Sequence, residues 1–128
     1  MIVHTYEYDI SYIPAMPVVE LVVGKASSAP VLSLKALVDS GSDGTIIPLE
    51  HLKQIGARKF QKRWMRTITG QRAQVDLYLI SIQIGSFQRD KLAVAGDPQL
   101  NEAIIGRDVL NHLIVTLDGL ANAVTISN

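Results

Sequence analysis

The chain is organised around residues 36–48, which read Ala36-Leu37-Val38-Asp39-Ser40-Gly41-Ser42-Asp43-Gly44-Thr45-Ile46-Ile47-Pro48. An alternating apolar run ends in an acid, a hydroxyl residue and a glycine, and apolar residues then resume. A carboxylate at the end of a buried strand is costly unless it is paired or functional. Gly41 and Gly44 permit a tight backbone, and the serine hydroxyls can hold a loop by local hydrogen bonds. The segment therefore predicts a strand that delivers an acidic loop to a cleft.

Two elements far apart in the chain resemble the catalytic elements of retropepsin-like aspartic proteases, the short dimeric kind. They are Leu37-Val38-Asp39-Ser40-Gly41 and Ile104-Ile105-Gly106-Arg107-Asp108. In that family an acid loop comes first, and an apolar-apolar-Gly segment then packs beside it and leads into a short helix. The order of elements extends over residues 17–127. The resemblance implies a mainly β fold: a closed, barrel-like acid-protease lobe with a flap hairpin and one or two short helices.

The resemblance also assigns roles to residues. Asp39 is expected to be the catalytic acid and base, within an active-site loop completed by Ser40, Gly41 and Ser42. The hydroxyl of Ser40 is expected to bridge to the loop of a partner subunit. Many members have alanine at the place of Ser42, and a hydroxyl there that donated to Asp39 would lower the apparent pKa of the catalytic pair.

Further positions follow from the same resemblance. Asp43 and Arg107 match an ion pair that ties the acid loop to the terminal helix. Thr69, Gly70 and Gln71 fall at the tip of the hairpin that serves as the flap. The terminal strands form the subunit interface in the family, so 2–8 or 124–127 are candidates for pairing between subunits.

Peptide hydrolysis by this chemistry needs two carboxylates that share a proton around one water molecule. Asp-Ser-Gly occurs once in the 128 residues, and the chain is too short for two lobes. The resemblance therefore predicts an aspartic endopeptidase that acts on peptide or protein substrates as a homodimer, with Asp39 of each subunit on the two-fold axis. The alternative is a non-catalytic peptide-binding or dimerisation module on the same fold.

A calcium-binding EF-hand loop is a rival interpretation of this segment. Asp39, Asp43, Gly44 and Glu50 fall at its first, fifth, sixth and twelfth places. However, Gly41 at the third place offers no ligand side chain, and proline occupies the tenth. The preceding residues alternate with the period of a strand rather than an entering helix. A plain polar turn between two strands is the other alternative.

Composition limits the remaining possibilities. The 128 residues, 48% of them hydrophobic, predict one domain spanning 1–128 with a filled core. No apolar run is long enough to span a bilayer, and the first residues do not form a secretory signal. The formal net charge of +0 and the absence of cysteine argue against nucleic-acid or membrane partners, disulfides and thiolate metal sites. We expect a cytoplasmic protein without metal or other cofactor, its three histidines being scattered in sequence.

The only charge run is Arg58-Lys59-Phe60-Gln61-Lys62-Arg63-Trp64-Met65-Arg66. A solvated strand face, a nucleic-acid patch and a preference for acidic substrates are all compatible with it. Around it, strands are expected at 18–24, 31–38, 46–47, 91–95, 113–117 and 123–127, and short helices after Pro48 and at 107–111. Residues 1–16 are expected to be an extended N-terminal arm. A change of phase predicts a bulge between Leu79 and Ile80.

Overall fold

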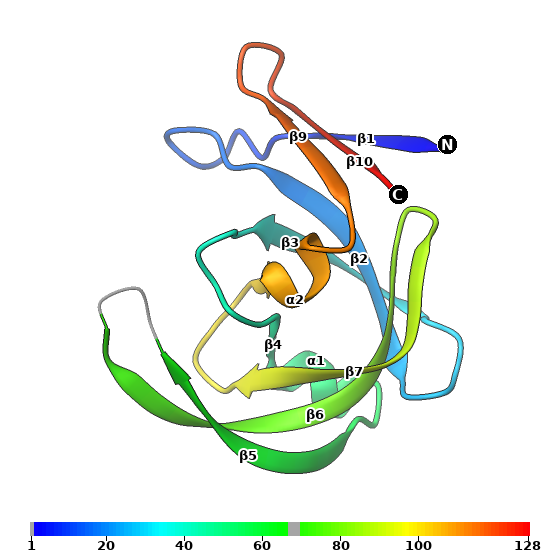
Figure 1. Cartoon of the computed structure of the whole chain (residues 1–128), viewed down its shortest axis with the longest axis vertical. Helices are drawn as coiled ribbons and strands as arrows, with labels where there is room; N and C mark the ends of the chain where they lie inside the picture. Colours follow the sequence, from blue (N-terminus) through cyan, green and yellow to red (C-terminus); the bar gives the residue numbers. More distant parts are fainter. Residues whose placement is uncertain (1, 67–69) are drawn as a thin grey trace.

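The computed structural model describes residues 2–66 and 70–128. In this part the chain is mainly β with two short helices (Figure 1). The strands are β1 Val3–Glu7, β2 Val18–Lys25, β3 Leu32–Val38, β4 Ile46–Pro48, β5 Arg58–Arg66, β6 Arg72–Ile84, β7 Phe87–Asp97, β8 Ala103–Ile105, β9 Ile114–Asp118 and β10 Ala123–Ser127. The helices are α1 Leu49–Gln54 and α2 Arg107–Leu110. Neither is long and apolar enough to cross a membrane.

Six strands close into a barrel. Their order is β2-β3-β8-β4-β7-β6, and antiparallel pairing of β6 with β2, from Val22↔Gln83 to Lys25↔Ile80, completes the ring. Alternating apolar residues of these strands fill the interior, where Leu21, Ile47 and Ile82 are fully buried. The expectation of a mainly β, closed-barrel fold with one or two short helices is confirmed.

The connection between β3 and β4 leaves a space that a later strand fills. β8 lies between them, parallel to β3 through Val38↔Ile105 and antiparallel to β4 through Ile46↔Ile104. The helix α2 follows β8 directly and lies in the middle of the molecule in Figure 1. The loop after β3 is therefore held against the start of α2.

The two chain ends form a separate three-stranded sheet of order β1-β10-β9. β10 is central, since it pairs with β1 through Tyr6↔Val124 and with β9 through Val124↔Leu117. The first part of the expected N-terminal arm, residues 1–16, is a strand of this sheet, because Val3–Glu7 pairs with β10. Residues 124–127 are already paired on both sides within the chain.

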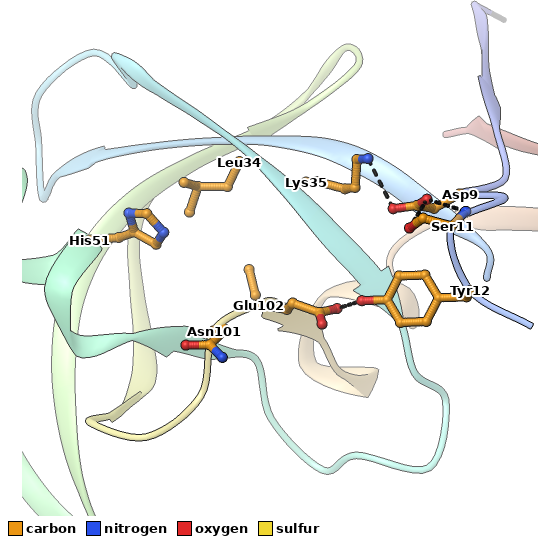
Figure 2. A pocket seen from close by; sticks show the side chains of 9 residues that line it. Asp9, Ser11, Tyr12, Leu34, Lys35, His51, Asn101 and Glu102 are labelled. Atoms are coloured by element: carbon orange, nitrogen blue, oxygen red, sulfur yellow. Dashed lines mark hydrogen bonds and ion pairs between the residues drawn. The ribbon is translucent and has the colours of Figure 1, made fainter. Parts of the chain in front are cut away.

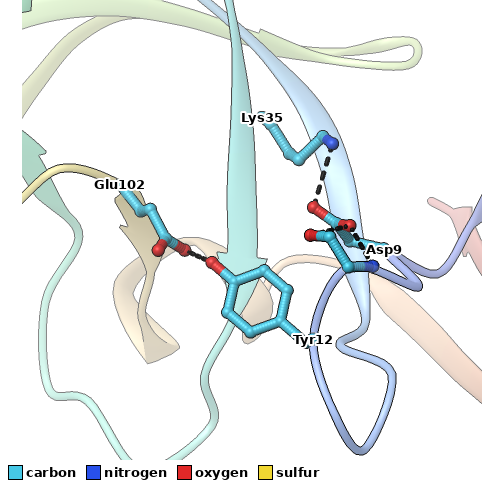
Figure 3. Close-up of polar contacts among 5 residues, drawn as sticks. Asp9, Tyr12, Lys35 and Glu102 are labelled. Atoms are coloured by element: carbon cyan, nitrogen blue, oxygen red, sulfur yellow. Dashed lines mark hydrogen bonds and ion pairs between the residues drawn. The ribbon is translucent and has the colours of Figure 1, made fainter.

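Residues 9–16 form a closed turn that packs on the barrel. Backbone hydrogen bonds join Asp9 and Met16 in both directions, at 2.8 and 3.0 Å. Figure 3 shows the two side-chain contacts that hold the turn: Lys35 Nζ lies 3.0 Å from Asp9 Oδ2, and the Tyr12 hydroxyl donates to Glu102. Hydrogen bonds from Ser11 and then Lys35 lower the pKa of Asp9 to about 2. The start of the chain is thus fixed to β3 and to the residues that lead into β8.

The predicted change of phase in β6 is present close to its expected place. The pairing of β6 with β7 shifts between Ile80 and Ile82, one residue beyond the position indicated by the sequence. A second shift, between Lys59 and Gln61, interrupts the pairing of β5 with β6. Bulges increase the local bend of a strand pair. Beyond them, the pairs from Arg63↔Val75 to Arg66↔Arg72 form a two-stranded ribbon outside the barrel.

Candidate active site

Asp39 stands at the point where β3 leaves the sheet. Its backbone N–H donates to the carbonyl of Ile105 at 3.0 Å, which continues the parallel pairing of β3 with β8 by one residue. The next polar contacts close a tight turn: Ser42 N donates to Asp39 O at 3.2 Å, and Gly41 N donates to Asp39 Oδ1 at 2.9 Å. The side chain is exposed, and Oδ2 accepts no hydrogen bond from the described part of the chain. One oxygen is therefore oriented by the loop and the other is left for a ligand.

The two serines of the loop have different roles. Ser42 donates its hydroxyl to the carbonyl of Gly44 at 2.7 Å. The expected donation from Ser42 to Asp39 is thus wrong in this structure, because the tight turn directs the hydroxyl to the backbone further along the loop. Ser40 is exposed, and its carbonyl accepts a hydrogen bond of 2.7 Å from Arg107 Nη1. A bridge from its hydroxyl to a partner subunit stays a prediction.

Arg107 ties the loop to α2 with three contacts. Its backbone N–H donates to Ser42 O at 2.9 Å, Nη1 binds Ser40 O, and Nη2 forms an ion pair with Asp43. The side chains of Arg107 and Asp43 are 41% and 58% exposed, so the ion pair itself is screened by water. The guanidinium acts chiefly by fixing the carbonyl of Ser40, next to Asp39.

A second anchor was not predicted from the sequence. Thr45, 1% exposed, donates its hydroxyl to Asp108 Oδ1 at 2.8 Å and its backbone N–H to Asp108 Oδ2 at 3.0 Å. The same hydroxyl accepts a hydrogen bond of 3.2 Å from Gly106 N. The sequence did contain one signal for this anchor: Thr45 directly precedes the apolar pair Ile46-Ile47. A hydroxyl group that is buried with such residues needs a hydrogen-bond partner. Nothing local to Thr45 identified Asp108 as that partner.

Replacing Thr45 with valine should lower the free energy of unfolding by about 1–3 kcal/mol, because the near-isosteric side chain leaves Gly106 N and Asp108 Oδ1 without their hydroxyl partner. Chemical denaturation measures the loss. The same change at Thr116, exposed on β9, is the control and should shift stability by less than about 0.5 kcal/mol. Equal effects of the two substitutions would show that the Thr45 hydroxyl contributes nothing.

Gly106 allows the loop and α2 to approach closely. A Cβ on this residue would lie 2.5 Å from the carbonyl carbon and oxygen of Gly44 and 2.9 Å from Ser42 O. All three are backbone atoms, which cannot move without displacing the loop. A side chain at 106 is therefore incompatible with the observed position of the acid loop.

The acid loop forms one wall of a cavity of about 320 Å³. The cavity is lined by Asp39, Gly41, Ser42 and Ile46 of the acid loop and the start of β4, by Met65, Arg66, Ala73 and Val75 of the β5–β6 ribbon, and by Asp97 at the end of β7. A second cavity of about 360 Å³ also contains Met65 and lies between Arg63 and Trp64 of the ribbon and Asp43 and Asp108 of the loop and α2. The ribbon and the acid loop thus line two neighbouring cavities, which share Met65 and together form the candidate active site.

Two of the three predicted flap residues, Gly70 and Gln71, directly precede β6 in this ribbon. Thr69 is outside the described residues. Gly70 has φ +86°, a conformation that favours glycine, and a Cβ there would meet nothing within 4 Å. Gln71 connects Gly70 to the start of β6 at Arg72.

A further cavity of about 400 Å³ lies away from the acid loop, between residues 9–12, β3, α1 and the start of β8 (Figure 2). Its polar side chains are largely occupied with one another: Asp9 binds Ser11 and Lys35, and Tyr12 binds Glu102. None of the predicted site residues lines it. The side-chain contacts around this cavity hold the N-terminal turn to the barrel, and they contribute nothing to the geometry around Asp39.

The described residues contain no group of three or more His, Asp or Glu side chains that could hold a metal ion. The carboxylates expected of a calcium loop point to other partners, since Asp39 binds Gly41 N and Asp43 binds Arg107. The residue before the loop belongs to β3, not to a helix. These contacts argue against a calcium-binding loop in this segment.

Comparison with known proteins places these features in a family. The family model described as "gag-polyprotein putative aspartyl protease" matches residues 31–112. No curated protein sequence matches the chain significantly.

Solved structures share the architecture. A retropepsin-like aspartic protease from Rickettsia conorii superposes with a TM-score of 0.67 at 14% identity, over 98% of this chain and 91% of its own. The EIAV protease superposes with a TM-score of 0.58 at 19% identity, over 76% of this chain and 86% of its own. The retroviral protease-like domain of Ddi1 from Leishmania major superposes with a TM-score of 0.55 at 21% identity, over 88% of this chain and 89% of its own. These likenesses show that the fold is retropepsin-like.

Proposed function

Because the chain belongs to the gag-polyprotein aspartyl protease family, we propose that it is an aspartic endopeptidase that works as a homodimer. The observation that carries this proposal is the position of Asp39. Its carboxylate is exposed in a cavity, oriented through Oδ1 by Gly41 N, and supported by a loop fixed through Arg107 and Thr45. A carboxylate held in this way is suited to hydrogen-bond a water molecule.

In the proposed reaction, Asp39 of one subunit and Asp39 of the other share one proton. The ionised carboxylate takes a proton from water, which attacks the carbonyl carbon of the peptide bond. The protonated carboxyl group donates to the carbonyl oxygen, where negative charge develops, and the carboxyl group that took the water's proton then passes it to the amide nitrogen as the C–N bond breaks. Because two like charges about 3 Å apart do not both ionise readily, the apparent pKa values belong to the pair.

The second carboxylate is assigned to a partner subunit because Asp-Ser-Gly occurs only once in the chain. Asp97 lines the same cavity as Asp39, but its Oδ1 accepts hydrogen bonds from Gln99 N at 2.8 Å and Leu100 N at 3.1 Å. These contacts give Asp97 a role in shaping the turn after β7. A two-fold arrangement that joins two acid loops supplies an equivalent second carboxylate.

The β5–β6 ribbon, with Gly70 and Gln71 directly before β6, is proposed to be the flap that covers an extended peptide, and Thr69 remains a predicted flap residue. Its inner residues Met65, Ala73 and Val75 already line the cavity opposite the acid loop. An apolar ribbon face above a polar loop would exclude bulk water from the scissile bond. We further propose that residues 1–128 act as one catalytic domain.

Cleavage of a denatured protein mixture, read by mass spectrometry from pH 3 to 8, tests this function. Where dimers are scarce, the total rate is expected to rise with about the square of the protein concentration, because only the dimer is active. Sedimentation over the same concentrations measures the dimer fraction independently. A rate that is linear throughout the monomeric range would refute the shared dyad. A stable dimer without cleavage at any pH would instead support a peptide-binding or dimerisation module.

A further inference from the structure

Half of the cationic side chains are concentrated on β5 and the start of β6, the hairpin whose far end is the ribbon opposite the acid loop. The chain has 12 lysines and arginines, balanced by 12 acids, and six of the cations lie between residues 58 and 72. No acid occurs from His51 to Val75. A chain with a formal net charge of +0 thus carries a strongly positive hairpin. Such a local field attracts ligands of the opposite charge.

Most of these cations have no acidic partner within the described part of the chain. Lys59 forms an ion pair with Asp76 at 3.2 Å, and the guanidinium of Arg72 lies over the ring of Trp64, 5.4 Å from its centroid. Lys62, Arg63 and Arg66 are exposed and form no ion pair with any described residue. Their charge is available to a ligand.

Two of the three line the candidate active site. Arg66 borders the cavity that contains Asp39, and Arg63 borders the adjacent cavity with Asp43 and Asp108. Asp43 is already paired with Arg107, and both oxygens of Asp108 accept hydrogen bonds from Thr45. Asp43 and Asp108 are therefore engaged, and the two arginines lie in the cavities together with the carboxylates of Asp39 and Asp97, which form no ion pair with any described residue.

We propose that the preferred substrates are peptides with aspartate or glutamate within about four residues of the cleaved bond, bound through Arg63 and Arg66. This inference rests on the proposed endopeptidase function. The two arginines are three residues apart on β5, about 10 Å along the strand, and this odd spacing places their side chains on opposite faces, so each would bind an acidic side chain in its own cavity. Arginine binds carboxylates in a bidentate manner, so it distinguishes an acid from its amide.

A peptide fits these observations better than a nucleic acid. Both arginines border cavities whose other wall carries carboxylates, and those carboxylates would repel a continuous phosphate backbone. The exposed ring of Trp64 has one face occupied by Arg72, which limits stacking of a base. An extended peptide carries its acidic side chains singly rather than as a continuous line of charge, and it does not need a free aromatic face for stacking.

The test begins with the sites cleaved in a denatured protein mixture, mapped by mass spectrometry. Aspartate and glutamate should be enriched near the cleaved bonds. One cleaved peptide is then synthesised with its glutamate and with glutamine in its place, and kcat/KM for the glutamate form should be about tenfold higher, mainly through KM. Added NaCl should remove this difference, because it screens exposed charges.

Charge reversal identifies the residues responsible. In the double variant R63E/R66E the preference should disappear or turn toward lysine and arginine. The control R58E/K62E makes the same change of charge on the same strand, at residues that border neither cavity, and should keep the acidic preference. Cleavage without acidic preference, or equal effects of both variants, would overturn the proposal while leaving the endopeptidase function intact.

Two other outcomes separate the remaining possibilities. Absence of cleavage by the unmodified chain would overturn the endopeptidase function and this inference together. Tight binding of a labelled single-stranded RNA oligonucleotide, lost in both double variants while the cleavage pattern stays unchanged, would identify the ribbon as a nucleic-acid surface and overturn the peptide interpretation.

Discussion

Replacing Asp39 with asparagine is expected to reduce kcat by about 10³-fold or more, since removal of a catalytic acid or base commonly costs this much. Asparagine has nearly the same shape and keeps an oxygen that can accept from Gly41 N, so the acid loop should retain its conformation. The amide neither takes a proton from water nor donates one as a carboxyl group does. The measurement is kcat on a peptide that the unmodified chain cleaves, at a concentration where sedimentation shows dimers.

Two matched substitutions accompany this experiment. Asp90, exposed on β7 away from the cavities, should tolerate asparagine with activity within about twofold of the unmodified chain, as surface changes usually do. Asp97→Asn should keep measurable turnover, because the amide oxygen still accepts from Gln99 N. An inactive Asp97→Asn with the fold and dimer preserved would indicate a dyad within one chain. Full activity of Asp39→Asn would remove the basis of the proposed mechanism.

Replacing Gly106 with alanine is expected to produce the largest loss of stability, about 2–3 kcal/mol, because overpacking against rigid atoms costs this much. The added methyl group would lie 2.5 Å from the carbonyl atoms of Gly44 and 2.9 Å from Ser42 O. Either α2 moves away or the acid loop shifts, so activity should fall together with stability. For a chain of this size the midpoint of thermal unfolding should decrease by about 10 °C.

Gly119 provides the control for this substitution. A Cβ there would meet nothing within 4 Å, so Gly119→Ala should change the free energy of unfolding by less than about 0.5 kcal/mol. A stable and active Gly106→Ala variant would show that the loop and α2 have more freedom than the structure indicates.

Local features of the fold were predictable because local chemistry determines them. The alternation before Asp39 predicted β3. Leu49, Leu52 and Ile55 at helical spacing, followed by Gly56, predicted α1, and Gly56 indeed has φ +72°. The acid loop was recognisable because its two acids, two serines and two glycines, at residues 39–44, are disfavoured in the interior of a strand.

Features that depend on distant contacts were not predictable. Thr45 and Asp108 are 63 residues apart, and neither has a local pattern that identifies the other. The pairing of β1 with β10 joins the two ends of the chain, and a single sequence contains no signal for such a register. The charge run on β5 could be read from the sequence, but only the structure shows that two of its arginines line the cavities beside the acid loop.

The insertion of β8 between β3 and β4 also determines when, during synthesis and folding, the acid loop becomes fixed. Ser40 and Arg107 are 67 residues apart, so the loop around Asp39 has no support until the last fifth of the chain is present. During synthesis, β2, β3 and the β5–β6 hairpin are completed while that loop still lacks its neighbours, since parallel pairing over such a separation is slow and late. A nascent or truncated chain would then lack the fixed acid loop that the proposed activity requires. The order of the strands would thus delay that activity until the chain is nearly complete.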